Sequence, residues 1–295
     1  MQTLAAMGFG DGLVLTDGAW GTQLQALGLP VGEFPDLWNL THPERVATVA
    51  RGYVEAGSQV ILTNTFGSNR MRLADQDESS KEKVGELNRR GVEISRGAAS
   101  GRARVFASIG PTGKLLMGGE VTPEEVAEAF AEQARALAEA GADALVVESM
   151  MDVEEARLAV EAAKATGLPV IASMVYDAGA ARDRTMMGTT PEQDAEVLAA
   201  AGADVVGANC GRGIADFVTI CRRLRAATGL PLWMKANAGL PELVDGRTVY
   251  RTTPEEFAGS VPALIEAGAR FVGGCCGTSP AFVREMARRF GGRSG

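Results

Sequence analysis

The amino-acid sequence of 295 residues predicts an α/β fold, a closed (β/α)8 barrel that forms a single domain over residues 1–295. Two observations predict it: helical stretches alternate with apolar runs, and a Gly-containing turn joins each helix to the run that follows. The pattern is written EAGSQVILTN from Glu55, EAGADALVVE from Glu139, AAGADVVGAN from Ala200 and EAGARFVGGC from Glu266. Each Gly suits a left-handed helix end, and each run is apolar on both faces, as a buried parallel strand is. An open doubly wound sheet is the structural alternative.

Eight apolar runs are predicted to be the strands of the barrel. They cover residues 13–17, 59–64, 104–109, 144–148, 169–175, 204–210, 231–237 and 270–275. Helices are expected between them, and several begin at a capping Thr that is followed by Pro, namely at Thr41, Thr122, Thr190 and Thr253. The long connections, at 67–80, 177–190 and 238–253, follow strands. In a barrel such connections lie at the carboxyl ends of the strands, where active sites are built.

Composition and charge exclude several classes of protein. The net charge is -8 and the acidic and basic residues are interleaved, so no basic stripe predicts binding to nucleic acid. No apolar run is long enough to span a bilayer, and the first ten residues lack the features of a signal peptide. We therefore expect a cytoplasmic protein with no membrane partner. Four cysteines in such a chain favour metal binding or catalysis over a disulfide framework.

Three of the four cysteines, Cys210, Cys275 and Cys276, fall at the carboxyl ends of predicted strands. Neighbouring cysteines such as Cys275 and Cys276 pair poorly as a disulfide. Three thiolates that meet at the barrel mouth match a catalytic zinc site with one open position, and Asn209 could add a weak oxygen ligand. The alternatives are ordinary core cysteines or redox-labile thiols. Cys221 lies in a helical stretch and is predicted to be a buried apolar residue.

Two acidic residues also end predicted strands and are candidate catalytic or substrate-binding residues. Asp17, followed by Gly18, ends the first strand, and Glu148 ends the fourth. A carboxylate at the barrel mouth can bind an amino group or accept a proton, although a strand-end acid can also cap the next helix. Thr63 and Asn64 end the second strand and are further candidates for substrate binding.

Aromatic residues gather in the first long connection, where Trp20, Phe34 and Trp38 could wall a pocket, stack on a cationic methyl group or pack the loop. The single histidine, His42, stands beside a helix start and is interpreted as a surface residue. The sequence therefore lacks a histidine base of the kind that Ser-His and Cys-His hydrolases use.

Four motifs, DGAWGT, TNTFGSN, GANCGRG and GGCCGTSP, occur in this order, and the sequence resembles the homocysteine S-methyltransferase family from about Leu13 to Arg288. This family includes the homocysteine domain of cobalamin-dependent methionine synthase and betaine-homocysteine methyltransferase. The resemblance implies a zinc ion (Zn2+) held by Cys210, Cys275 and Cys276, and methyl transfer to homocysteine to give methionine. It also implies that Asp17, Gly18 and Glu148 hold the amino acid end of homocysteine.

The resemblance leaves several methyl donors open. A donor linked to methylcobalamin or methyltetrahydrofolate is the main expectation, carried by a separate protein or free in solution. Betaine or S-methylmethionine is the alternative: Trp38 matches a tryptophan that betaine-using relatives place near the donor, whereas Gly67 and Ser149 stand where the animal enzymes carry tyrosines. Two hypotheses of other kinds are a zinc or redox sensor that binds homocysteine without turnover, and a Schiff-base enzyme that uses Lys235.

Overall fold

The computed structural model describes residues 7–244 and 247–291. The strands are β1 (Val14–Leu15), β2 (Val60–Ile61), β3 (Arg104–Ile109), β4 (Ala144–Met150), β5 (Val170–Met174), β6 (Val205–Cys210), β7 (Leu232–Ala236), β8 (Glu242–Val244), β9 (Arg247–Val249) and β10 (Ala269–Gly274). The α-helices are α2 (Gly21–Ala26), α3 (Trp38–Thr41), α4 (Pro43–Ala56), α5 (Arg70–Gln76), α6 (Val84–Ala99), α7 (Pro123–Glu139), α8 (Val153–Lys164), α9 (Pro191–Ala200), α10 (Ile214–Ala227), α11 (Pro254–Glu266) and α12 (Pro280–Phe290). Three short 3-10 helices are η1 (Pro35–Leu37), η2 (Glu78–Lys83) and η3 (Leu116–Gly118).

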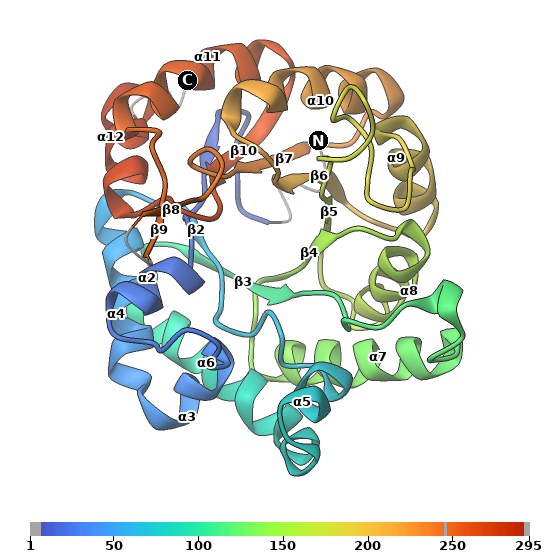
Figure 1. Cartoon of the computed structure of the whole chain (residues 1–295). Helices are drawn as coiled ribbons and strands as arrows, with labels where there is room; N and C mark the ends of the chain where they lie inside the picture. Colours follow the sequence, from blue (N-terminus) through green and yellow to red (C-terminus); the bar gives the residue numbers. More distant parts are fainter. Residues whose placement is uncertain (1–6, 245–246, 292–295) are drawn as a thin grey trace.

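The main sheet is parallel and has eight strands in the order β1-β10-β7-β6-β5-β4-β3-β2. A parallel bridge between Thr16 and Val60 links its two outer strands, so that the sheet is nearly closed and helices surround it (Figure 1). The predicted (β/α)8 barrel is thereby confirmed, and the open sheet is not. Each of its eight strands overlaps one of the eight apolar runs that were predicted to form strands.

The seam between β1 and β2 is held largely by side chains, which explains why these two strands are shorter than predicted. The amide N–H of Leu15 donates to Gln59 Oε1 at 3.0 Å, and the amide N–H of Leu62 donates to Asp17 Oδ2 at 2.7 Å. Backbone groups that bond to side chains are not available for a strand ladder. The seam therefore brings the carboxylate of Asp17 into the barrel wall.

Aromatic side chains fill the amino-terminal end of the barrel. Phe9 lies with its ring centroid 5.7 Å from that of Phe271, and Phe271 lies 5.4 Å from Trp233. Phe106 completes this cluster, with its ring 6.3 Å from that of Trp233. All four are packed within one apolar cluster, so the carboxyl end of the barrel is the end that remains open for a site.

Helix starts follow the predicted capping chemistry at three of four positions. Thr122, Thr190 and Thr253 each form a capping box with the Glu or Gln three residues later, ahead of a Pro at the first turn. The expectation at Thr41 was wrong, because this residue ends α3 and His42 takes the cap position of α4.

The connection between β7 and α11 contains a feature that was not predicted, the antiparallel hairpin of β8 and β9. It belongs to the long connection 238–253 and follows a strand, so it lies on the side of the barrel where active sites are built.

Among the described residues, no helix is long and apolar enough to cross a membrane.

Candidate active site at the carboxyl ends of the strands

The three cysteines predicted to act together meet at the barrel mouth. The Sγ atoms of Cys210, Cys275 and Cys276 all lie within 4.8 Å of one another, the one such group found among the described residues. Strand pairing explains why the three thiols lie together. Cys210 and Gly274, the residue before Cys275, both lie in register with Ala236 of β7, the strand between β6 and β10. The two sequence-distant thiol positions are therefore held at one level of the barrel wall.

Three glycines, Gly273, Gly274 and Gly277, flank Cys275 and Cys276. Of these, only Gly277 has a positive φ, of 80°. A Cβ atom at Gly273 would lie 1.9 Å from Thr16 Oγ1, and one at Gly274 would lie 2.3 Å from Thr278 Oγ1. Close packing against these two threonines therefore requires the glycines. Cys210 itself adopts a positive φ of 63°, which is uncommon for a residue with a side chain.

The thiols share hydrogen bonds that make one of them easier to ionise. Hydrogen bonds from Cys210 and Cys275 lower the pKa of the Cys276 thiol. The corresponding hydrogen bonds to Cys275 and Cys276 raise the pKa of Cys210. The hydrogen bonds among the thiols thus favour a shared negative charge in the cluster, and a bound cation would favour ionisation of the remaining thiols.

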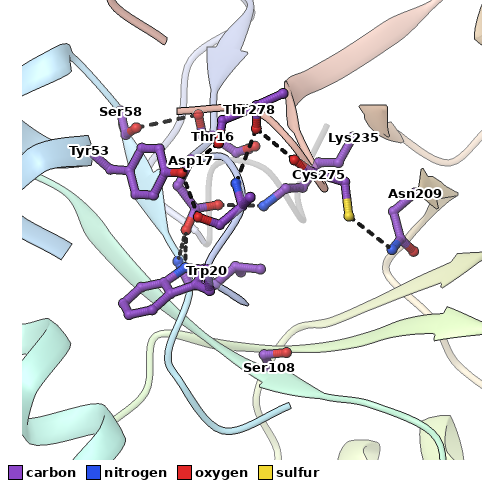
Figure 2. A network of polar contacts seen from close by, with 12 residues as sticks. Thr16, Asp17, Trp20, Tyr53, Ser58, Ser108, Asn209, Lys235, Cys275 and Thr278 are labelled. Atoms are coloured by element: carbon purple, nitrogen blue, oxygen red, sulfur yellow. Dashed lines mark hydrogen bonds and ion pairs between the residues drawn. The ribbon is translucent and has the colours of Figure 1, made fainter. Parts of the chain in front are cut away.

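Asn209 is fully buried beside the cluster, and its oxygen is already engaged. Its Oδ1 accepts hydrogen bonds from the Ser149 amide at 2.8 Å and from Ser173 Oγ at 2.7 Å. Its Nδ2 donates to Ser149 Oγ at 2.7 Å and faces Cys210 Sγ at 3.3 Å. The same Nδ2 faces Cys275 Sγ at 3.9 Å (Figure 2). Asn209 therefore supports the sulfur atoms as a hydrogen-bond donor, and the expected oxygen ligation by this residue is not supported.

Asp17 lies behind the cleft, with no exposed surface. Its Oδ2 accepts hydrogen bonds from Trp20 Nε1 at 2.8 Å and from the Leu62 amide at 2.7 Å, and its Oδ1 forms an ion pair with Lys235 Nζ (Figure 2). Burial alone would lower the pKa of Lys235, but Asp17 and the nearby Glu148 raise it above its usual value. A lysine held protonated in this way is a poor nucleophile, which opposes the Schiff-base hypothesis.

Glu148 was predicted to end the fourth strand, but β4 continues to Met150, so Glu148 lies within it. Its side chain is almost fully buried. Ser108 Oγ donates a hydrogen bond to its Oε1 at 2.5 Å. Burial raises the pKa of Glu148 to about 7, whereas the positive charge of Lys235 opposes this increase. A carboxyl group with such a pKa can gain or lose a proton near neutral pH.

The cysteine cluster and Glu148 open into a cleft of about 630 Å³ at the barrel mouth. Its apolar wall includes Trp20, Phe34 and Phe66, and Lys235 lies at its surface. Of the residues predicted to bind substrate, the cleft is lined by Gly18, Thr63, Asn64 and Glu148. Asp17 and Trp38 are not among the lining residues.

The side chains of Thr63, Asn64 and Trp38 are engaged with their surroundings. Thr63 Oγ1 accepts from the Ser108 amide at 3.1 Å, and Asn64 Nδ2 donates to the Pro35 carbonyl at 2.8 Å. Trp38 is buried, and its Nε1 donates to Glu33 Oε1 at 2.9 Å. These contacts fix the loops that border the cleft.

Sequence reasoning missed one polar residue beside the cysteines, Asn237, which follows β7. Its amide donates to the Cys210 carbonyl at 3.0 Å and its Nδ2 donates to the Gly211 carbonyl at 2.6 Å. Its buried Oδ1 has no hydrogen-bond partner among the described residues. The available signal was its position at the end of the seventh predicted strand, the same position at which the other site residues were found.

The fold and the site define a class of protein, the (β/α)8 barrels with a cluster of thiols at the carboxyl ends of their strands. The chain belongs to the homocysteine S-methyltransferase family, whose profile matches residues 14–290. The predicted resemblance is thereby confirmed.

Two relatives are the methionine synthases of Mycobacterium tuberculosis and Mycobacterium leprae, each 31% identical over 294 residues. These matches cover 93% of the chain and 24% of each relative, so the chain spans about a quarter of their length. Among solved structures, the metallated form of the homocysteine methyltransferase MmuM from Escherichia coli has a TM-score of 0.78 and 25% identity, and covers 97% of this chain and 98% of its own. The carboxyl transferase domain of Rhizobium etli pyruvate carboxylase, with a TM-score of 0.55 and 18% identity, shares the fold alone.

Proposed function

We propose that the chain transfers a methyl group to the thiol of homocysteine to give methionine, with a zinc ion held by Cys210, Cys275 and Cys276. The convergence of the three Sγ atoms within 4.8 Å, in a cleft that also presents Glu148, is the observation that carries the proposal. Membership of the homocysteine S-methyltransferase family supports the same activity.

The residues fit a zinc ion. Zinc binds thiolate sulfur at about 2.3 Å, which for a tetrahedral site separates the sulfur atoms by roughly 3.8 Å, and these thiols are already close to that spacing. The lowered pKa of Cys276 and the amide donor of Asn209 favour negative charge on sulfur. The unpartnered Oδ1 of Asn237 is a further oxygen donor beside the cluster. When bound, zinc would lower the pKa of the substrate thiol and so supply a thiolate at neutral pH.

The chain's own residues bind and orient the acceptor. Glu148 has one oxygen held by Ser108, which leaves the other to accept a hydrogen bond from the substrate amino group. Gly18, Thr63 and Asn64 border the same part of the cleft. Trp20, Phe34 and Phe66 give the cleft an apolar wall that excludes water from the sulfur nucleophile, which therefore stays poorly solvated and reactive.

For the donor, we propose a methyl group linked to methylcobalamin or methyltetrahydrofolate, presented by a partner protein or free in solution. The identity of 31% to two methionine synthases supports this choice. Betaine or S-methylmethionine is the second candidate, since Trp20, Phe34 and Phe66 offer aromatic surface for a cationic methyl group. Phe34 fills the space beside Gly67, where a Cβ atom would lie 2.3 Å from its ring. A bulky residue at Gly67 is therefore not needed to make that wall aromatic.

A donor panel tests the proposal. Purified, zinc-loaded protein is incubated with homocysteine and, separately, methylcobalamin, methyltetrahydrofolate, betaine, S-methylmethionine or S-adenosylmethionine, and methionine is quantified. We expect methionine with the cobalamin or folate donor and none with the Cys276→Ser variant. Turnover with betaine or S-methylmethionine alone would select the second candidate. Tight homocysteine binding without methionine from any donor would favour a sensor.

A further inference from the structure

Arg72 is a half-buried cation at the far end of the cleft from Cys210. It lies on α5, in the connection that follows β2, whereas Cys210 ends β6. In the ring of eight strands, β2 and β6 are opposite one another, because three strands separate them in either direction. Figure 1 shows α5 on the opposite side of the barrel from β6 and β7. The cleft, which both Arg72 and Cys210 line, therefore extends across the barrel mouth.

The guanidinium of Arg72 is unpaired among the residues that the structure describes. Its neighbour on α5, Arg70, forms an ion pair with Glu132 at 2.6 Å. Lys235, the other cation that lines the cleft, forms one with Asp17. Arg72 has no such partner in the described part of the chain, although an arginine carries five N–H donors in a fixed plane. These donors can therefore be met by a ligand in the cleft.

Close packing holds the Arg72 side chain in place. A Cβ atom at Gly113 would lie 2.9 Å from Arg72 Nη1, and one at Gly67 would lie 3.4 Å from Arg72 Cγ. The ring of Phe34 also adjoins Gly67, so an aromatic wall borders the arginine. Gln76, one helical turn further along α5, lines the same cleft. A cation that is fixed in this way loses little side-chain entropy when a ligand binds.

Two carboxylates border the same end of the cleft, Glu33 and Asp36. Both are engaged by other groups: Glu33 Oε1 accepts from Trp38 Nε1 at 2.9 Å, and Asp36 Oδ1 accepts from Ser68 Oγ at 2.7 Å. Their negative charges disfavour a ligand with several negative charges, such as a polyphosphate. The fork of an arginine matches a single carboxylate, which it can bind through two parallel hydrogen bonds.

We propose that Arg72 binds a carboxylate of the methyl donor, so that the donor lies across the cleft with its methyl group toward the thiols and its carboxylate at α5. The inference rests on the proposed function and narrows the choice of donor. Methyltetrahydrofolate, betaine and S-methylmethionine carry a carboxylate, whereas methylcobalamin does not. The cleft of about 630 Å³ has room for a second small molecule beside homocysteine.

Each carboxylate donor has an analogue that lacks this group. Choline lacks the carboxylate of betaine, 3-aminopropyl-dimethylsulfonium lacks that of S-methylmethionine, and 5-methyltetrahydropterin lacks those of methyltetrahydrofolate. Isothermal calorimetry measures the binding of each donor and each analogue to zinc-loaded protein. Methionine is present in place of homocysteine, so that the acceptor position is filled and no methyl transfer occurs. We expect the wild type to prefer at least one donor over its own analogue, and that pair identifies the donor.

In Arg72→Gln this preference for the donor should fall by about 10- to 100-fold, the worth of a charge-assisted hydrogen bond, while the analogue binds as before. Arg70→Gln is the matched control. It removes a cation from the same helix, but Arg70 pairs with Glu132 and does not line the cleft, so the preference should remain. Arg72→Lys keeps the charge without the planar fork and should lose only part of the preference.

A merely structural role of Arg72 would weaken donor and analogue alike, or would give Arg72→Gln and Arg70→Gln the same effect, and either result would overturn the proposal. Thermal unfolding checks that the variants are folded. If methylcobalamin alone yields methionine and no carboxylate donor is preferred over its analogue, the proposed function stands and the role of Arg72 fails. If a donor binds in the Arg72-dependent way but no donor yields methionine, the proposed function fails and the carboxylate site stands.

Discussion

The Sγ atoms of Cys210 and Cys275 lie 3.2 Å apart, although 65 residues separate the two cysteines in the sequence. Neither strand pairs with the other, and β7 sets their common level through Ala236. The thiol cluster is therefore a product of barrel register. A shift of one residue in any of these three strands would point a cysteine to the other face of the sheet and dissolve the cluster.

Replacing Cys276 tests whether the cluster holds zinc. The wild-type protein is expected to contain about one zinc per chain by elemental analysis, because three thiolates are a catalytic zinc donor set. Cys276→Ser should lose the metal and the methyl transfer activity. The matched control is Cys221→Ala, since Cys221 is buried in α10 and its sulfur faces the Leu264 carbonyl, away from the cluster. Full activity of metal-free wild-type protein would contradict the proposal.

Asn209→Ala is expected to weaken metal binding by about 10- to 100-fold, the usual effect of removing a group that supports metal ligands. The variant loses the Nδ2 donor that faces Cys210 Sγ and leaves the Ser149 amide without its acceptor. Competition with a chromogenic chelator measures the affinity. Ser173→Ala removes one contact of Asn209 and leaves the sulfur contacts intact, so it should retain near-normal affinity. Equal effects of the two substitutions would count against a role for the Asn209 amide.

Glu148→Gln is expected to raise the KM for homocysteine by about 10- to 100-fold, with a smaller change in kcat, because a charge-assisted hydrogen bond to the substrate amino group becomes a neutral one. Glu155→Gln is the control. Glu155 is also a buried carboxylate, but it accepts hydrogen bonds from Thr112 and does not line the cleft. Steady-state kinetics measures the KM for homocysteine of both variants. A larger increase in KM for Glu155→Gln than for Glu148→Gln would refute the role of Glu148 in binding the substrate amino group.

Asp36 gives a prediction about pH and stability. It is buried and accepts hydrogen bonds from the Gly67 amide and Ser68 Oγ, and burial raises its pKa from 3.8 to about 6. The folded state therefore binds more protons than the unfolded state between these two values. The contribution of Asp36 to the free energy of unfolding thus falls as pH rises through that window, by roughly 1–3 kcal/mol in total.

Asp36→Asn removes this titration and can retain both hydrogen bonds. The variant should match the wild type in stability near about pH 4 and exceed it by roughly 1–3 kcal/mol above about pH 7. Urea unfolding of both proteins across this range measures the difference. A difference that does not change with pH would show that Asp36 is not the group responsible.

The barrel could be predicted from the sequence because its signals are local. A Gly that ends a helix, an apolar run and a Thr-Pro helix start each depend on a few neighbouring residues, and their alternation specifies the topology. The hairpin of β8 and β9 was missed because it lies in a connection, where no burial pattern marks a strand. The shortness of β1 and β2 was missed because side chains of Gln59 and Asp17 replace backbone partners there.

The site could be predicted only as a set of residue types. The sequence by itself determined that three cysteines and two acids stand at strand ends, since strand ends are set by local apolar patterns. Only the tertiary structure decided what each of them faces: Asn209 turns its amide nitrogen to the thiols, Asp17 is enclosed by Lys235, Trp20 and Leu62, and Glu148 remains open to the cleft. The physical reason is that burial and hydrogen-bond partners come from other strands, and the pairing of strands that are far apart in the chain fixes both.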